Sequence, residues 1–256
     1  MSYKILKTDP FLTPYENDIK LRAEDFKNKR NELLKDCATL KDFANGYLYF
    51  GLNKTRNGYI FREWAPEADA MFLTGDFNGW DVKACPMRKL SGGVFEVFLE
   101  GENTLQVGQK VQAIVMHQGE MLRRIPLYAT RVVQDPQNHM WCAEVEDTYA
   151  EYPWTDAGFM PAKTPFIYEC HIGMAQEKGA VGTYKEFTEN ILPRVKEQGY
   201  NTIQIMAIME HPYYGSFGYQ VSNFFAAASR YGYSRDLKEL INTAHGMGIT
   251  VLLDVV

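Results

Sequence analysis

Short runs of β-branched and aromatic residues recur along the first part of the chain, and turn-forming pairs such as Asn57-Gly58 and Gly92-Gly93 separate them. Their spacing is typical of an all-β sandwich, in which turn signals return every 8–12 residues or so. The runs occupy residues 47–52, 59–64, 70–74, 94–99, 111–116, 121–125 and 141–145. We therefore predict an immunoglobulin-like sandwich of about seven strands within residues 46–150.

The last part of the chain, residues 165–256, alternates between apolar runs and segments of helical periodicity. The runs at residues 165–171, 202–206 and 250–255 indicate buried strands. Thr183 and Glu186 form the capping box of a first helix, which Pro193 should kink or split. Strands joined by helices in this order predict a parallel sheet that is covered on its helical side.

One connection between strand and helix, residues 207–233, is unusually long and contains eight aromatic residues. Connections of this length are uncommon in compact domains unless they are functional. In a (β/α) barrel, the loops that follow the strands build the active-site face. Aromatic rings with a polar edge suit the flat faces of sugars, so this segment predicts a sugar-binding loop.

Two further segments complete the predicted organisation. Residues 1–45 have a rough helical pattern with a start signal at Thr13-Pro14, and we interpret them as an N-terminal helical segment. Residues 151–164 are rich in proline and turn formers and are interpreted as a linker. The predicted domains are therefore 1–45, 46–150, 151–164 and 165–256.

Charge and composition narrow the function classes. A net charge of −5 argues against nucleic acid or an anionic membrane as the main partner and favours a neutral ligand. The four cysteines form no C-x-x-C pair and no secretory signal is visible, so we expect reduced thiols in a cytoplasmic protein. The five histidines lack metal-ligand spacing and nucleotide-binding motifs are absent, so we expect no metal ion and no cofactor.

Two tryptophans are candidate sugar contacts in the predicted sandwich. Trp80 follows the Asn78-Gly79 turn, where a large ring is hard to bury, and we favour sugar stacking over packing against a neighbouring loop. Trp64 ends a predicted strand, and a core position is as consistent with the sequence as an exposed one.

Asp254 is the most unusual polar residue of the last part, because it follows a strand of apolar residues. Burying an unpaired carboxylate is costly, so Asp254 requires an ion-pair partner or a functional site. Tyr219 lies within the aromatic segment, where loop packing is the structural alternative. Glu169 and His171 share one face of the first predicted strand and form a candidate buried polar pair without a catalytic role.

The motifs FREWAP (61–66) and FLTGDFNGW (72–80) resemble the starch-binding, immunoglobulin-like module that precedes the catalytic barrel in glycogen branching enzymes. The module also occurs in regulatory glycogen-binding subunits. The resemblance implies glucan contacts at Trp80, near Trp64, and within residues 91–94 at Gly93. The second tryptophan of the regulatory relatives is missing, since the comparable turn reads HQGEM here.

The stretches YECHIGMAQ, YYGSFGYQVSNFFAAASRYG and ITVLLDVV resemble the opening of the catalytic barrel of 1,4-α-glucan branching enzymes, in glycoside hydrolase family 13 of the α-amylase superfamily. The resemblance implies the first three βα units of a (β/α)8 TIM barrel. It implies that Tyr219 stacks on the sugar at the cleavage point and that Asp254 supports other active-site side chains. It places the nucleophile Asp and the acid/base Glu beyond Val256.

The implied activity is cleavage of an α-1,4-glucan and transfer of the segment to a sugar 6-hydroxyl, by a retaining double displacement that makes α-1,6 branches in glycogen. This chain alone is expected to bind α-glucan without turnover. A stand-alone glucan-binding or regulatory module with a vestigial barrel remains the alternative. A debranching or amylase-type hydrolase is a weaker option, because FGYQVSNFFA replaces the shorter loop usual in those enzymes.

Overall fold

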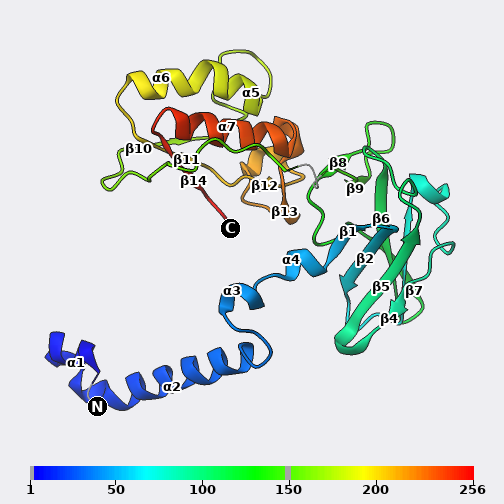
Figure 1. Cartoon of the computed structure of the whole chain (residues 1–256), viewed down its shortest axis with the longest axis horizontal. Coiled ribbons are helices and arrows are strands. Elements are labelled where there is room, and N and C mark those ends of the chain that lie inside the picture. The colour runs from blue at the N-terminus through cyan, green and yellow to red at the C-terminus, as the bar shows by residue number, and fades with distance from the viewer. Residues whose placement is uncertain (1–2, 148–150) are drawn as a thin grey trace. The chain divides into compact units, whose positions relative to one another are not determined.

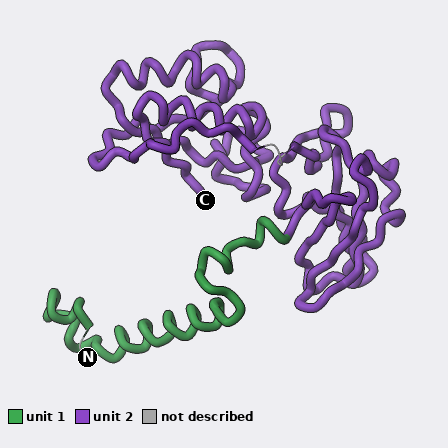
Figure 2. Tube along the Cα trace, in the orientation of Figure 1, with its two compact units in different colours: residues 1–49 green, residues 50–256 purple. Residues whose placement is uncertain are grey.

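The computed structural model describes residues 3–147 and 151–256, and the chain divides into two compact units, Met1–Tyr49 and Phe50–Val256 (Figure 2). The first unit is helical, with α1 (Lys4–Thr8), α2 (Glu16–Leu33), α3 (Leu40–Phe43) and α4 (Gly46–Tyr49). A 3-10 turn at Pro10–Tyr15 precedes α2, so that helix begins three residues after Thr13. Its apolar residues are not buried, and no side chain of α2 lies in a core.

The second unit begins with a sandwich of two antiparallel sheets (Figure 1). One sheet has the order β1-β2-β5-β4, and the other has the order β3-β6-β9-β8, with β7 paired to β6. The strands are β1 (Gly51–Thr55), β2 (Gly58–Trp64), β3 (Ala70–Gly75), β4 (Arg88–Lys89), β5 (Val94–Glu100), β6 (Lys110–His117), β7 (Glu120–Arg124), β8 (Val132–Gln134) and β9 (Trp141–Glu144). Six of the seven predicted strands are present where the sequence placed them, and β4 and β8 are short additions. The first predicted run, residues 47–52, is wrong over most of its length, because Gly46–Tyr49 form the helix α4 and the strand β1 begins only at Gly51.

Alternation along β2 positions the candidate Trp64. Tyr59 and Phe61 point into the core between the sheets, where Phe61 packs with Leu73 of β3 and other buried residues. Because successive strand residues face opposite sides, Arg62 and Trp64 lie on the other face from Phe61. The core interpretation of Trp64 is therefore wrong, and its side chain is 56% exposed.

A three-stranded parallel sheet follows, formed by β10 (Ile167–Cys170), β11 (Thr202–Ile205) and β14 (Thr250–Leu253) in that order. Ile203 and Ile205 of β11 are buried against the helices α5 (Tyr184–Glu186), α6 (Leu192–Glu197) and α7 (Ser234–Gly246) (Figure 1). The opposite face is more open, and Glu169 and Leu252 are exposed there. The predicted parallel order and the one-sided helical cover are both present.

Pro193 splits the first helical pattern as expected. The capping box of Thr183 and Glu186 starts α5, and a π-helical turn at Phe187–Ile191 separates α5 from α6. Pro193 then lies in the first turn of α6. Proline has no backbone N–H and its ring crowds the carbonyl four residues earlier, so a wider turn accommodates it better than a continuous α-helix.

The aromatic segment is more ordered than the sequence suggested. It contains a small antiparallel hairpin of β12 (Met209–Glu210) and β13 (Asn223–Ala227), with a bulge between Met209 and Glu210. Short 3-10 turns at Tyr214–Ser216 and Ser229–Tyr231 follow β12 and β13 respectively. The long loop predicted for residues 207–233 is therefore divided by a hairpin, which fixes where residues 211–222 begin and end.

Candidate functional site

Tyr219 and Asp254 lie together at the end of the parallel sheet. Asp254 follows β14, and its backbone N–H donates to the carbonyl of Ile205 on β11 at 3.1 Å. The Tyr219 hydroxyl donates to Asp254 Oδ2 at 2.8 Å, and that hydrogen bond, with a smaller effect of burial, raises the pKa of the Tyr219 phenol. The Tyr219 side chain remains 42% exposed, so the carboxylate holds its hydroxyl while the ring stays accessible.

Backbone geometry brings the loop to this position. Phe217 and Gly218 have positive φ angles of 53° and 93°. A Cβ atom on Gly218 would lie 1.8 Å from the carbonyl oxygen of Ala207, which is far inside van der Waals contact. Only glycine permits this close approach, so the residue immediately before Tyr219 lies directly against the chain that leaves β11.

A buried carboxylate holds the base of the hairpin. Glu210 is fully buried, and its two oxygens accept hydrogen bonds from the backbone N–H groups of His211 at 3.1 Å and Ser229 at 2.7 Å. Its backbone carbonyl accepts from the Ser222 N–H at 2.9 Å. Glu210 thus connects the start of the Tyr219 loop with its return strand. The sequence analysis missed this residue, although an acidic residue beside the apolar run 202–209 was a visible signal.

His171 does not pair with Glu169, so the expected polar pair is wrong. Glu169 is exposed and accepts a hydrogen bond from Gln204 Nε2 at 3.2 Å. His171 Nε2 lies 3.0 Å from the hydroxyl of Tyr231. The strand ends at Cys170, so the alternation of side chains assumed for Glu169 and His171 does not extend to His171. Burial, and then a smaller electrostatic interaction with nearby His211, lower the pKa of His171.

Trp64 and Gly93 meet at the end of β2. The Trp64 indole N–H donates to the carbonyl of Gly92 at 3.0 Å, which leaves the ring face open. Gly93 has φ of 79°, and a Cβ atom there would lie 2.5 Å from Cα of Pro66. The absence of a side chain at Gly93 therefore allows its turn to pack closely against the chain after Trp64. This contact fixes the orientation of the indole.

Trp80 occupies a different turn, after β3. Its φ is 64°, and its indole N–H donates to Asp76 Oδ1 at 2.9 Å. The ring is partly buried. Asp76 also accepts from the backbone N–H of Lys110 at 2.7 Å, so it joins the turn to β6. Among residues 3–147 and 151–256, no hydrogen bond connects Trp80 with Trp64 or Gly93.

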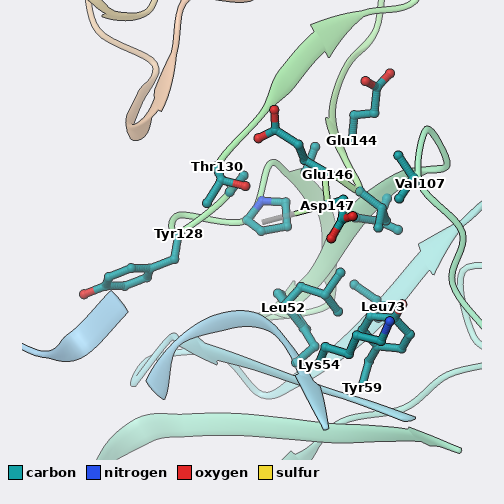
Figure 3. Close-up of a pocket in the computed structure, with 16 residues that line it drawn as sticks. Leu52, Lys54, Tyr59, Leu73, Val107, Tyr128, Thr130, Glu144, Glu146 and Asp147 are labelled. Carbon is teal, nitrogen blue, oxygen red and sulfur yellow. The ribbon is translucent and has the colours of Figure 1, made fainter. Parts of the chain in front are cut away.

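A cavity of about 160 Å³ opens between the two sheets of the sandwich (Figure 3). Apolar side chains form much of its wall, and Glu144, Glu146 and Asp147 contribute carboxylates, as the labelled sticks show. Its apolar lining includes Leu52, Phe61, Leu73, Val107, Val111, Ala143 and Val145. Sugar stacking needs an accessible ring face, and Tyr219 and Trp64 present exposed rings, so they are the better sugar-stacking candidates.

In the described part of the chain, no group of three or more His, Cys, Asp or Glu residues is arranged to hold a metal ion. The four cysteines are free thiols. The helices of the described residues include none that is both long and apolar enough to cross a membrane.

Both the sandwich and the parallel-sheet part of the second unit match known protein families. Residues 49–136 match the model of carbohydrate-binding module 48 (isoamylase N-terminal domain). Residues 166–256 match the model of the alpha amylase catalytic domain. A pullulanase from Bacillus acidopullulyticus has a similar fold, with a TM-score of 0.65 and 22% sequence identity over 81% of this chain and 29% of that chain.

Curated relatives extend the match over nearly the whole chain. The chain is 44% identical to the 1,4-alpha-glucan-branching enzyme of Rhizophagus irregularis and 43% identical to that of Aspergillus oryzae, over 98% of its length in each case. It spans 38% of the length of each relative. The chain is thus similar to 1,4-alpha-glucan-branching enzymes over nearly its whole length, with a match to carbohydrate-binding module 48 ahead of a match to the alpha amylase catalytic domain.

Proposed function

We propose that this chain is the N-terminal part of a glycogen branching enzyme, which cleaves an α-1,4-glucan and transfers the segment to a sugar 6-hydroxyl. The hydrogen bond between Tyr219 and Asp254 is the observation that carries the proposal. It joins an exposed phenol ring to a carboxylate at the carboxyl end of a parallel strand, the edge at which barrel enzymes place their active sites.

The parallel strands β10, β11 and β14 are, in this proposal, the first three strands of a (β/α)8 barrel. Their sequential order supports this assignment, because neighbouring strands of such a barrel follow one another along the chain. The proposed domains are a helical segment at 1–45, the glucan-binding module at 46–150, a linker at 151–164 and the partial barrel at 165–256.

Each candidate residue has a distinct role in the proposed reaction. Tyr219 stacks on the sugar at the cleavage point, and Asp254 orients it and other groups of the site. A retaining transfer requires two further carboxyl groups about 5–5.5 Å apart, a nucleophile and an acid/base. We assign neither to residues of this chain, and we expect the 256-residue chain to bind α-glucan without turning it over.

The sandwich module supplies further glucan contacts in this proposal. Trp64 offers an open indole face whose N–H is already satisfied, which suits stacking on a pyranose ring. Gly93 supports that face, and Trp80 adds a contact at a separate turn, after β3. The free thiols accord with the cytoplasmic location that we propose for the protein.

The direct test incubates the full-length protein with amylose. We expect the iodine colour to fall without a matching rise in reducing ends, and isoamylase treatment to release new short chains. Release of reducing ends with no isoamylase-sensitive linkages would indicate a hydrolase and contradict the proposal. The 256-residue chain, assayed in parallel, should be retained on glycogen beads and leave the iodine colour unchanged.

A further inference from the structure

Arg230 contacts the backbone at the start of the Tyr219 loop. It lies in the turn after β13, and its Nη1 and Nη2 groups donate to the carbonyl oxygens of His211 at 2.7 Å and Pro212 at 2.6 Å. These two carbonyls belong to the first residues after β12. One rigid, planar guanidinium therefore fixes the position and the direction of the chain as it enters the loop.

The same guanidinium also contacts two aromatic rings. Its central carbon lies 5.9 Å from the ring centroid of Tyr214, within the loop, and 5.7 Å from the ring centroid of Trp141. Trp141 begins β9 of the sandwich. Arg230 thus connects the backbone of the Tyr219 loop, a ring of that loop and the sandwich module through a single side chain.

Ion pairing does not account for this arrangement. Within the described residues, no carboxylate lies within 4.0 Å of the Arg230 guanidinium. The neighbouring Glu210 carboxylate already accepts from two backbone N–H groups. The positive charge is instead satisfied by two carbonyl dipoles and two π faces, interactions that depend on planar geometry and that lysine reproduces poorly.

We propose that Arg230 is a positioning residue that fixes the Tyr219-bearing loop, residues 211–222, against the sandwich module. Its two hydrogen bonds hold the entry of the loop, and its contacts with Tyr214 and Trp141 orient it relative to β9. Without Arg230, the entry of the loop is released, and Tyr219 loses its fixed place beside Asp254. The consequence for catalysis rests on the proposed branching function, whereas the structural consequence does not.

Limited proteolysis tests the structural part without any activity. Chymotrypsin cleaves after the exposed Tyr213 and its aromatic neighbours only when the loop opens locally. In the full chain, we expect Arg230→Ala to speed loop cleavage about tenfold, since two charge-assisted hydrogen bonds are lost, and Arg230→Lys to speed it nearly as much. Arg235→Ala is the matched control, because Arg235 lies 5.9 Å from the Tyr152 ring and, within the described residues, makes no hydrogen bond, ion pair or ring contact with residues 211–222. Equal cleavage rates for the Arg230→Ala variant and wild type would overturn the proposal.

A second variant tests the connection to the sandwich. Trp141→Leu removes the π face from β9 and leaves the hydrogen bonds of Arg230 to the loop backbone in place. We expect faster loop cleavage than in wild type but slower cleavage than in the Arg230→Ala variant. If Trp141→Leu cleaves at the wild-type rate, the loop is not held against the sandwich and that part of the proposal is wrong.

Activity of the full-length protein tests the functional consequence. We expect Arg230→Ala to lower kcat/KM on amylose by about 10- to 100-fold, because a displacement near 1 Å in a reacting site has effects of this size. Millimolar ethylguanidinium should restore part of that activity, while wild type and Arg235→Ala are unaffected. A loss that ethylguanidinium does not relieve indicates general destabilisation and contradicts positioning. Inactive wild-type protein would refute the branching function, and the proteolysis result would still decide the role of Arg230.

Discussion

Gly218 offers the sharpest test of how the loop places Tyr219. The substitution Gly218→Ala adds one methyl group at a residue with φ of 93°, where an alanine is strained. The added Cβ would lie 1.8 Å from the carbonyl oxygen of Ala207, whereas real Cβ atoms essentially never approach another atom within 3.0 Å. The loop must therefore retreat by about 1 Å or more, in addition to a conformational cost on the order of 1–2 kcal/mol.

A displacement of the loop by about 1 Å is large compared with the tolerance of the hydrogen bond between Tyr219 and Asp254. The Tyr219 hydroxyl lies 2.8 Å from Asp254 Oδ2, so the same displacement takes it beyond hydrogen-bond distance. Misplacing a substrate-contacting group by this amount reduces catalysis by about 100-fold. We therefore expect kcat/KM of the full-length protein on amylose to fall about 100-fold in the Gly218→Ala variant.

The matched control is Gly179→Ala, at a glycine of the same βα part whose added Cβ would have no atom within 4 Å. Kinetics on amylose and thermal unfolding are measured for both variants. Activity of the Gly179→Ala variant should stay within about twofold of wild type. If Gly218→Ala were as active as Gly179→Ala, the close approach to Ala207 would not be what places Tyr219, and the reasoning above would be refuted.

Three further predictions follow from single contacts. Tyr219→Phe removes the hydroxyl that donates a hydrogen bond to Asp254, so kcat/KM on amylose should fall about tenfold with little change in the thermal midpoint. An unchanged kcat/KM would contradict the role of that hydrogen bond. Trp64→Ala should weaken retention on glycogen beads about three- to tenfold, whereas Trp154→Ala, at another exposed tryptophan, should not; equal retention of both variants would argue against Trp64. Burial lowers the pKa of His171 in the folded protein, so as the pH falls His171 is protonated in the unfolded state before it is protonated in the folded state. The contribution of neutral His171 to the free energy of unfolding is therefore fully present above the unfolded pKa of about 6.5 and declines below it. When the pH is lowered from about 7.5 to 5.5, the midpoint of urea unfolding should fall less in the His171→Gln variant than in wild type. The same dependence of the midpoint on pH in both proteins would exclude His171 as the cause.

The sequence revealed those parts of the fold that depend on local periodicity. The strand runs of the sandwich, the parallel order of β10, β11 and β14, and the break at Pro193 all follow from repeating patterns or backbone chemistry. The face of Trp64 was also readable, because Trp64 is three residues from Phe61 and therefore points to the opposite side.

The rest depends on contacts between distant residues. Two-residue strands such as β4 and β12 are too short to show any periodicity. The hydrogen-bond partners of Arg230 and Glu210 lie up to 19 residues away in the sequence, and the Trp141 ring that Arg230 contacts lies much farther, so no local pattern predicts these contacts. Asp254 was identifiable as an anomaly, and the resemblance implied a role for Asp254 and one for Tyr219, but the contact between them spans 35 residues and was not predicted. Site geometry of this kind is decided by tertiary packing.

The sandwich also contributes to the scaffold of the site beyond Arg230. Arg131, just before β8, donates to the carbonyl of Gly232 at 2.9 Å, and its guanidinium lies 4.1 Å from the ring centroid of Tyr233. Asn223 Nδ2 at the start of β13 donates to the carbonyl of Pro126 at 3.2 Å. These contacts hold both ends of the segment that follows the Tyr219 loop. A module that only recruited glucan would need no such contacts, whereas a module that fixes the loop requires polar bonds of defined direction at its base, and those are the bonds that these residues make.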